Sequence, residues 1–182
     1  MVQFAKQLLG MMITGALVSP TVWAADTAVV NFSAQISDGS CEIQLSQDTL
    51  QFGIYKAVDF QTSTAVAILP LTAAVTCSGP TTPKLTVTGT TPYASGAIFR
   101  DADSVAAGAG FMVRRDTGNI DLGNFYNEAA AINNNASVSL SPVSTADAPQ
   151  NEPFLLGLVR AGSETITPGA IKATLTFTVS FD

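Results

Sequence analysis

Residues 173–181 constrain the possible fold of this chain more than any other segment. The odd positions are apolar (Ala173, Leu175, Phe177, Val179 and Phe181), and the even positions all carry hydroxyl groups. Because successive side chains of a β-strand point to opposite faces, this alternation predicts a strand with one buried face and one wet face. The same period of two recurs along the chain, and helical spacing is nearly absent.

Several other segments have the composition of short strands. They are residues 42–45, 49–54, 65–77, 84–88, 110–115, 120–122, 138–140 and 154–160. Pro70 interrupts the longest of them, which indicates an edge or a bulge at that point, because proline cannot donate to a β-ladder. Residues 116–119 form a hairpin-type turn. Residues 127–132 could make one short helical turn, and 78–83 and 144–153 are turn-rich loops.

The composition agrees with many short strands. Charged residues make up only 12% of the chain, whereas Thr, Ser, Ala, Val and Gly are abundant. Seven or eight strands at loop-like intervals predict an all-β fold, a sandwich of the immunoglobulin type.

The N-terminus, residues 1–24, has the layout of a cleaved secretory signal peptide. A single Lys6 precedes an apolar run at residues 8–18, and Val22-Trp23-Ala24 suits a signal peptidase. The alternative is a membrane anchor, but a span needs about 20 apolar residues, and this run has 11 before Ser19-Pro20. Cleavage after Ala24 would leave 158 of the 182 residues, enough for one domain and without a membrane span.

Net charge argues against nucleic acid as a partner. Without Lys6 the chain holds 7 basic and 14 acidic residues, and Arg114-Arg115 is the only adjacent basic pair. Binding to nucleic acid or to an anionic membrane surface therefore has no electrostatic support.

The two cysteines, Cys41 and Cys77, are expected to form one disulfide, because exported chains meet an oxidising compartment. Two buried free thiols are the alternative. A thiol-redox role would need a close C-x-x-C pair, whereas 35 residues separate these two. The bridge is therefore expected to be structural.

The residue inventory argues against an enzyme and against any cofactor or metal. The chain contains no histidine, which excludes Ser-His-Asp and Cys-His sites and the commonest transition-metal ligand. Asp101 and Asp103 are the closest carboxylates. Paired carboxylates can hydrolyse glycosides or hold calcium, but these two lie in a loop-like stretch that favours solvated turn acids. A carboxylate-based hydrolase would need acidic residues close together in a cleft.

Together these residues resemble the fimbrial (pilus) subunits of the chaperone–usher pathway, in particular the type 1 fimbria-like pilins. Such subunits carry a glycine fourteen residues from the C-terminus, an alternating last strand and an aromatic penultimate residue. Here Gly169, residues 173–181 and Phe181 match. The early cysteine pair and residues 108–113, followed by a turn and Ile120, are similar to the family's cysteines and middle hairpin. The likeness covers the whole chain after residue 24.

The resemblance implies an immunoglobulin-like sandwich that lacks its last strand. Residues 39–182 would form this pilin domain, and its groove motif would be Gly169, Ala173, Leu175, Phe177, Val179 and Phe181. A periplasmic chaperone would fill the groove first. The N-terminal extension of a neighbouring fimbrial subunit would then replace it, as the fibre grows through an outer-membrane usher.

The matching extension is residues 25–38. The alternate residues Ala28, Val30, Phe32, Ala34 and Ile36 would occupy successive pockets of a neighbour. The family often has glycine where Ala34 stands, so the register is open by one pocket. Alternation alone would equally suit an ordinary first strand of the chain's own domain; the C-terminal pattern favours donation.

The resemblance thus implies a structural subunit of an adhesive fimbria on the surface of a Gram-negative bacterium, reached through the periplasm. The alternative is a single-domain fimbrial adhesin that binds a host glycan or protein.

Overall fold

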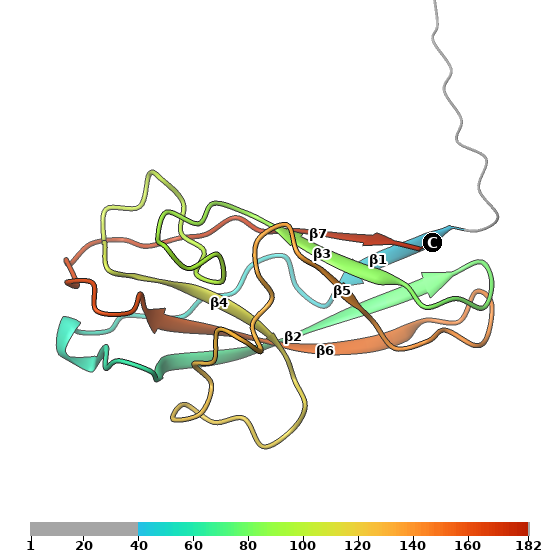
Figure 1. The fold of residues 1–182 in the computed structure, drawn as a ribbon, viewed down its shortest axis with the longest axis horizontal. Helices are drawn as coiled ribbons and strands as arrows, with labels where there is room; N and C mark the ends of the chain where they lie inside the picture. Colours follow the sequence, from blue (N-terminus) through green and yellow to red (C-terminus); the bar gives the residue numbers. More distant parts are fainter. Residues whose placement is uncertain (1–39, 182) are drawn as a thin grey trace, which may run out of the picture. The chain divides into compact units, whose positions relative to one another are not determined.

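The computed structural model describes residues 40–181 (Figure 1). The predicted signal peptide and N-terminal extension therefore lie outside the described residues.

The described residues form two antiparallel sheets (Figure 1). The four-stranded sheet has the order β1 (Cys41–Leu45), β2 (Ala65–Cys77), β6 (Gln150–Arg160), β4 (Ala109–Arg115). The three-stranded sheet has the order β5 (Ser137–Ser139), β3 (Lys84–Thr88), β7 (Thr176–Ser180). One short 3-10 helix, η1 (Ala57–Asp59), lies between β1 and β2. The all-β class and the incomplete immunoglobulin-like sandwich predicted from the sequence are confirmed.

The first core fills the space between the sheets. It is built from the alternating inward residues of each strand, such as Val75 on β2, Leu85 and Val87 on β3, and Phe154 on β6. Leu175, Phe177 and Val179 pack against this core but stay only partly buried. The β7 side of the sandwich is therefore less completely covered than the rest.

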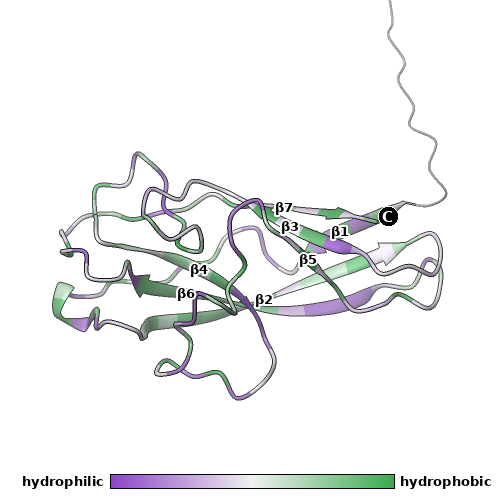
Figure 2. Cartoon of the chain, in the orientation of Figure 1, coloured by the Kyte–Doolittle hydropathy of each residue, from purple (hydrophilic) through white to green (hydrophobic). Residues whose placement is uncertain are grey.

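A second core covers the opposite face of the four-stranded sheet. There Met112, Phe125 and Val159 are fully buried beneath loops that precede and follow β4. Figure 2 shows the result, with hydrophobic residues along β4 and the end of β6, and polar residues at the start of β6. Because both faces of β4 and of the second half of β6 are buried, those strands read as continuous apolar runs instead of alternating ones.

The predicted disulfide is present between Cys41 and Cys77, which lie directly opposite each other on β1 and β2. The bridge ties the short edge strand β1 to its only paired neighbour in the described part. A loop of this length is worth roughly 4 kcal/mol in the chain-entropy account of disulfides.

Two predicted strands are wrong. Residues 49–54 make no ladder with any strand of residues 40–181, and Gly53 among them has a positive φ. Residues 120–122 lead into a turn, since the Asp121 carboxylate accepts the main-chain N–H groups of Gly123 and Asn124 at 2.9 and 3.0 Å. The turn at 116–119 exists, with Gly118 and Asn119 at positive φ, but it does not make a hairpin.

Other boundaries shift. β2 runs unbroken through Pro70, whose carbonyl accepts a hydrogen bond from the Gln47 side chain at 3.3 Å. Because β1 pairs only with residues 73–77 of β2, Pro70 does lie on an edge, as expected. β6 begins at Gln150, inside the predicted loop 144–153, and β7 covers only the second half of 173–181.

Candidate functional site

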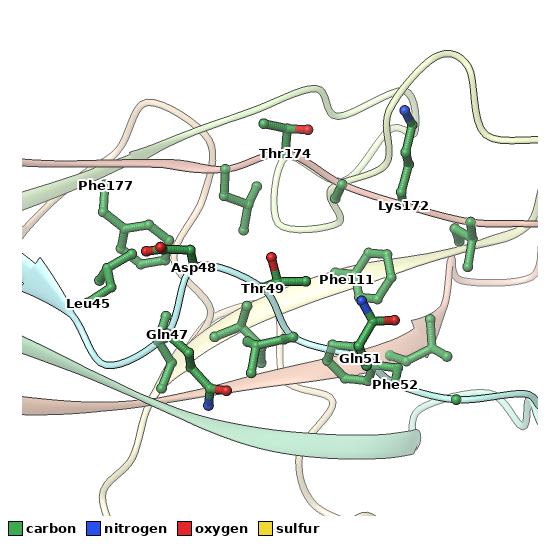
Figure 3. Close-up of a pocket in the computed structure, with 18 residues that line it drawn as sticks. Leu45, Gln47, Asp48, Thr49, Gln51, Phe52, Phe111, Lys172, Thr174 and Phe177 are labelled. Carbon is green, nitrogen blue, oxygen red and sulfur yellow. The ribbon is translucent and has the colours of Figure 1, made fainter.

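A groove of about 510 Å³ opens beside β7 (Figure 3). Its floor is apolar and comes from the four-stranded sheet: Leu71 of β2, Phe111 of β4, and Leu156 and Leu158 of β6. All four of these side chains belong to the buried set, so the groove reaches the core itself. It is therefore not a shallow surface depression.

One wall of the groove is residues 45–53, which begin at the last residue of β1. Leu45, Leu50 and Phe52 contribute apolar side chains to it. The ring of Phe52 packs on that of Phe111, with centroids 5.1 Å apart. This contact fixes the wall to the floor, although beyond Ser46 the wall pairs with no strand in the described part of the chain.

The other wall is residues 171–177, which run into β7. Ile171, Ala173, Leu175 and Phe177 line the groove and are half-buried. The even-numbered side chains between them are exposed, and in Figure 3 Lys172 and Thr174 point away from the cavity while Phe177 points toward it. The alternation seen in the sequence thus places a row of apolar side chains along the groove.

The main chain of β7 is also open on this side. The carbonyls of Pro83, just before β3, and of Val87 on β3 accept hydrogen bonds from the N–H groups of Leu140 and Asn135 on the β5 side, at 2.8 and 3.0 Å. Even-numbered residues of β3 therefore face β7 and, by the strand register, bond to even-numbered residues of β7. The N–H and C=O groups of Leu175, Phe177 and Val179 consequently point to the free edge, where no strand of the described residues pairs with them.

Upstream of β7, a loop replaces β3 as the hydrogen-bonding partner of the main chain. The N–H of Asp101 donates to the carbonyl of Lys172 at 2.9 Å, and the Asp101 carboxylate accepts both the N–H and the hydroxyl of Thr174, at 2.9 and 2.8 Å. The N–H groups of Val105 and Ala106 both donate to the carbonyl of Ala170. Residues 170–174 are thereby held extended in line with β7.

Gly169 lies where the chain passes closest to this loop. Its φ is +151°, and a Cβ there would lie 2.7 Å from the N of Ala106 and from a methyl carbon of Val105. Any side chain would push the two segments apart, since one of these atoms is main chain. The glycine singled out by the sequence is thus required by close approach, but it does not line the groove.

The predicted groove residues divide into three groups. Ala173, Leu175 and Phe177 line the cavity, whereas Val179 packs on the first core next to it. Phe181 follows β7 and is half-buried. Sequence reasoning missed Ile171, although it continues the odd-numbered apolar series, and it missed the role of residues 45–53, whose partner across the groove lies more than a hundred residues away.

The acidic residues weighed as a hydrolytic or calcium site have structural roles. Asp101 caps Thr174, and Asp103 forms an exposed ion pair with Lys172 at 2.7 Å. The hydrogen bond and charge of Lys172 lower the pKa of Asp103 below its ordinary value. No group of three or more potential metal ligands occurs in residues 40–181, and no helix there is long and apolar enough to cross a bilayer.

Comparison with known proteins agrees with this geometry. Residues 30–182 match the family described as Fimbrial protein. No curated protein matches the sequence significantly. A solved chaperone–usher pilus that reveals the basis of rod uncoiling is similar in fold, with a TM-score of 0.56, 12% identity, and coverage of 90% of this chain and 100% of that one.

Two further solved structures share the fold. The P pilus rod subunit PapA matches with a TM-score of 0.56 and 13% identity, over 78% of this chain and 99% of that one. An antigen and type I fimbria protein of Burkholderia pseudomallei matches with a TM-score of 0.53 and 17% identity, over 78% and 99% of the two chains.

The chain belongs to the fimbrial protein family and is a subunit of a surface pilus. The resemblance inferred from Gly169 and the alternating C-terminus is therefore confirmed. Members of this family are structural proteins, so the chain is not an enzyme, and its partners include other subunits of the fibre.

Proposed function

We propose that the groove beside β7 accepts a strand from a neighbouring subunit, and that this exchange joins the subunits of the pilus. The observation that carries the proposal is the coincidence of two openings in one place. The free main-chain edge of β7 runs along an apolar groove whose floor is the core of the sandwich. A single added strand would satisfy the edge and cover the core together.

The N-terminal extension, residues 25–38, supplies a strand of the right pattern. Its apolar residues Ala28, Val30, Phe32, Ala34 and Ile36 recur every second position, as do the groove-facing residues 171–179. Burial of Val30, Phe32 and Ile36 would contribute about 1.5–3 kcal/mol each. Each new main-chain hydrogen bond would add a net 0.5–1.5 kcal/mol or so. These magnitudes suit a contact that seldom dissociates.

The same open groove explains why the subunit would need a chaperone before assembly. An uncovered apolar groove beside an unpaired strand edge is prone to edge-to-edge aggregation. A periplasmic chaperone that occupies the groove would prevent this, and an outer-membrane usher of a Gram-negative bacterium would then present it to the next subunit's extension. The assembled fibre would support cell adhesion.

Removal of residues 25–36 tests the proposal. The shortened subunit keeps its groove, so it should still co-purify with the chaperone. It should fail to insert into the preceding subunit, and fibres should be lost from electron micrographs of the cell surface. Replacement of the apolar residues by alanine at the same length is the matched control for chain length, and it should weaken assembly to a smaller degree. Normal polymerisation of the deletion variant would show the proposal to be wrong.

A further inference from the structure

The groove wall at residues 171–177, together with the preceding Ala170, has two halves with different support. The second half belongs to β7 and is bonded to β3. β3 ends at Thr88, so no strand of the described residues pairs with residues 170–174 on that side. Their even-numbered main-chain groups are engaged instead by residues 101–106, which lie in a loop about 70 residues earlier in the sequence.

We propose that residues 101–106, hereafter the clasp loop, hold the 170–174 half of the groove in strand geometry before any donor strand arrives, with Asp101 as the positioning residue. The proposal rests on the function proposed above. It adds the element that keeps this half of the groove ready to be paired.

Asp101 is at the centre of the contact. Its main-chain N–H and both carboxylate oxygens bond to Lys172 and Thr174 at 2.8–2.9 Å. The hydroxyl of Ser104 completes the ladder, lying 3.1 Å from both the N and the O of Lys172. The side chains of Asp101 and Ser104 thus supply the hydrogen bonds that β3, which ends at Thr88, does not reach far enough to make.

The clasp loop is itself braced from within. The Arg100 guanidinium donates to the carbonyls of Ser104 and Ala106, at 2.7 Å each. Two charge-assisted bonds of this kind fix the loop's shape. The loop can therefore act as a rigid template for residues 170–174.

This support determines the direction of Ile171 and Ala173. In a strand, fixing the even-numbered main-chain groups toward one edge leaves the odd-numbered groups directed to the other. With residues 170, 172 and 174 bonded to the clasp loop, the N–H and C=O groups of residues 171 and 173 face the free edge, in register with those of β7. Without Asp101, a donor strand would first have to order this half, which slows its insertion.

The test compares two carboxylates of the same loop. Asp101→Ala removes both side-chain bonds to Thr174, and Asp101→Asn keeps an oxygen that can still accept from the Thr174 N–H. Asp103→Ala is the control, because it removes only the exposed ion pair with Lys172, a kind of contact that contributes little. Each full-length variant is purified from the periplasm with its chaperone and mixed with an excess of a synthetic peptide of residues 25–38, and chaperone displacement is followed.

We expect peptide capture to be about tenfold slower or more for Asp101→Ala, a factor that corresponds to loss of one good hydrogen bond. Capture should be partly restored in Asp101→Asn and unchanged in Asp103→Ala. Peptides shortened from either end should separate the halves: one of the two should lose its sensitivity to Asp101→Ala, because it no longer reaches residues 171 and 173.

Hydrogen exchange gives a readout that does not depend on the peptide. The Thr174 amide should lose protection in Asp101→Ala, whereas amides paired between β3 and β7 should keep theirs. Equal capture rates and equal Thr174 protection in all three variants and the natural protein would overturn the proposed role of the clasp loop. Failure of the natural protein to capture any peptide would instead count against the strand-exchange function, while Thr174 protection would still decide the role of Asp101.

Discussion

At the scale of single residues, Gly157 shows how closely the second core is packed. It lies in the middle of β6, and a Cβ there would come within 2.2 Å of the Phe125 ring. That ring is completely buried, and the Arg114 guanidinium lies 5.7 Å from its centre. The absence of a side chain at residue 157 therefore makes room for the aromatic ring.

We expect Gly157→Ala to destabilise the protein by about 1–3 kcal/mol, the usual cost of overpacking a core. Urea denaturation followed by Phe-sensitive near-UV circular dichroism measures this. Gly118→Ala is a poor control because of its positive φ. Gly79→Ala is the better one, since a Cβ at Gly79 meets nothing within 4 Å, and it should change stability little. An equal effect of the two substitutions would contradict the packing argument.

Glu152 is the buried charged residue of the described part. Burial alone would raise its pKa, but donors of Ser141 and Gln150 and the charge of Arg115, 3.2 Å away, outweigh burial and lower the pKa. Because the folded-state pKa lies below the ordinary 4.5, the carboxylate stabilises the fold above pH 4.5. This stabilisation is lost as the pH falls through the lowered value.

Glu152→Gln should therefore cost about 1–3 kcal/mol at pH 7, the scale of a buried group with impaired hydrogen bonding. The difference from the natural protein should shrink once the pH falls below about 4.5. Urea denaturation at pH 7 and at successively lower pH checks both statements. A difference that stays constant with pH would mean that packing, not charge, is responsible.

At the scale of elements, β1 depends on its covalent link. It has five residues, and β2 is its only paired neighbour within residues 40–181. A strand this short gains little from its ladder alone, and the Cys41–Cys77 bridge joins it to β2 at a directly opposed pair. The groove wall at 45–53 continues from β1, so the bridge also anchors that wall.

Replacement of both cysteines by serine should lower stability by about 2–5 kcal/mol. The loss should be matched by treating the natural protein with a reductant, which provides the control. Thermal unfolding with and without reductant measures it. Insensitivity of the natural protein to reductant would show that the bridge adds nothing to stability.

Strands were predictable from the sequence where one of their faces is exposed to solvent. The segment around β7 and the strand at 84–88 alternate cleanly, and each was placed within a few residues. β6 was harder, because its polar start at Gln150 looks like a loop and its end is buried on both faces. Residues 49–54 have strand composition but pair with no strand among residues 40–181, which no local pattern can reveal.

At the scale of the whole molecule, the groove could be predicted only in part. The odd-numbered residues of the C-terminus indicated one wall, and the resemblance of Gly169 and Phe181 to the family indicated that a strand is missing. The opposite wall, the floor at Leu71 and Phe111, and the clasp loop arise from contacts between residues far apart in sequence. Those contacts exist only once the sheets have stacked.

The donating and accepting ends of the subunit should be separable in mixtures. A variant without residues 25–36 can accept but not donate. Leu175→Asp places a charge on the groove wall, so that variant should donate but not accept, because burial of an unpaired carboxylate is strongly unfavourable. When the two variants are mixed in the presence of chaperone, they should form dimers of one donor and one acceptor subunit. Polymers longer than dimers should not form.

Gel electrophoresis without heating measures this outcome. Thr176→Asp, next along the chain but with an exposed side chain, is the matched control and should accept a donor as the natural protein does. Longer polymers in the mixture, or dimers formed by either variant alone, would be inconsistent with one donor and one acceptor per subunit.

Pro70 has a consequence for the fidelity of assembly. A subunit that offers a strand edge to its neighbours must prevent pairing at the wrong edge. Beyond β1, the uncovered edge of β2 carries a residue that has no N–H and whose carbonyl is already bonded to Gln47. The edge of β4 opposite β6 is occupied by reciprocal main-chain bonds between Phe99 and Phe111. An incoming strand would therefore find an interrupted row of main-chain groups on β2 and an edge of β4 that is already hydrogen-bonded. Along β7 it would find a continuous row of main-chain groups with which to pair.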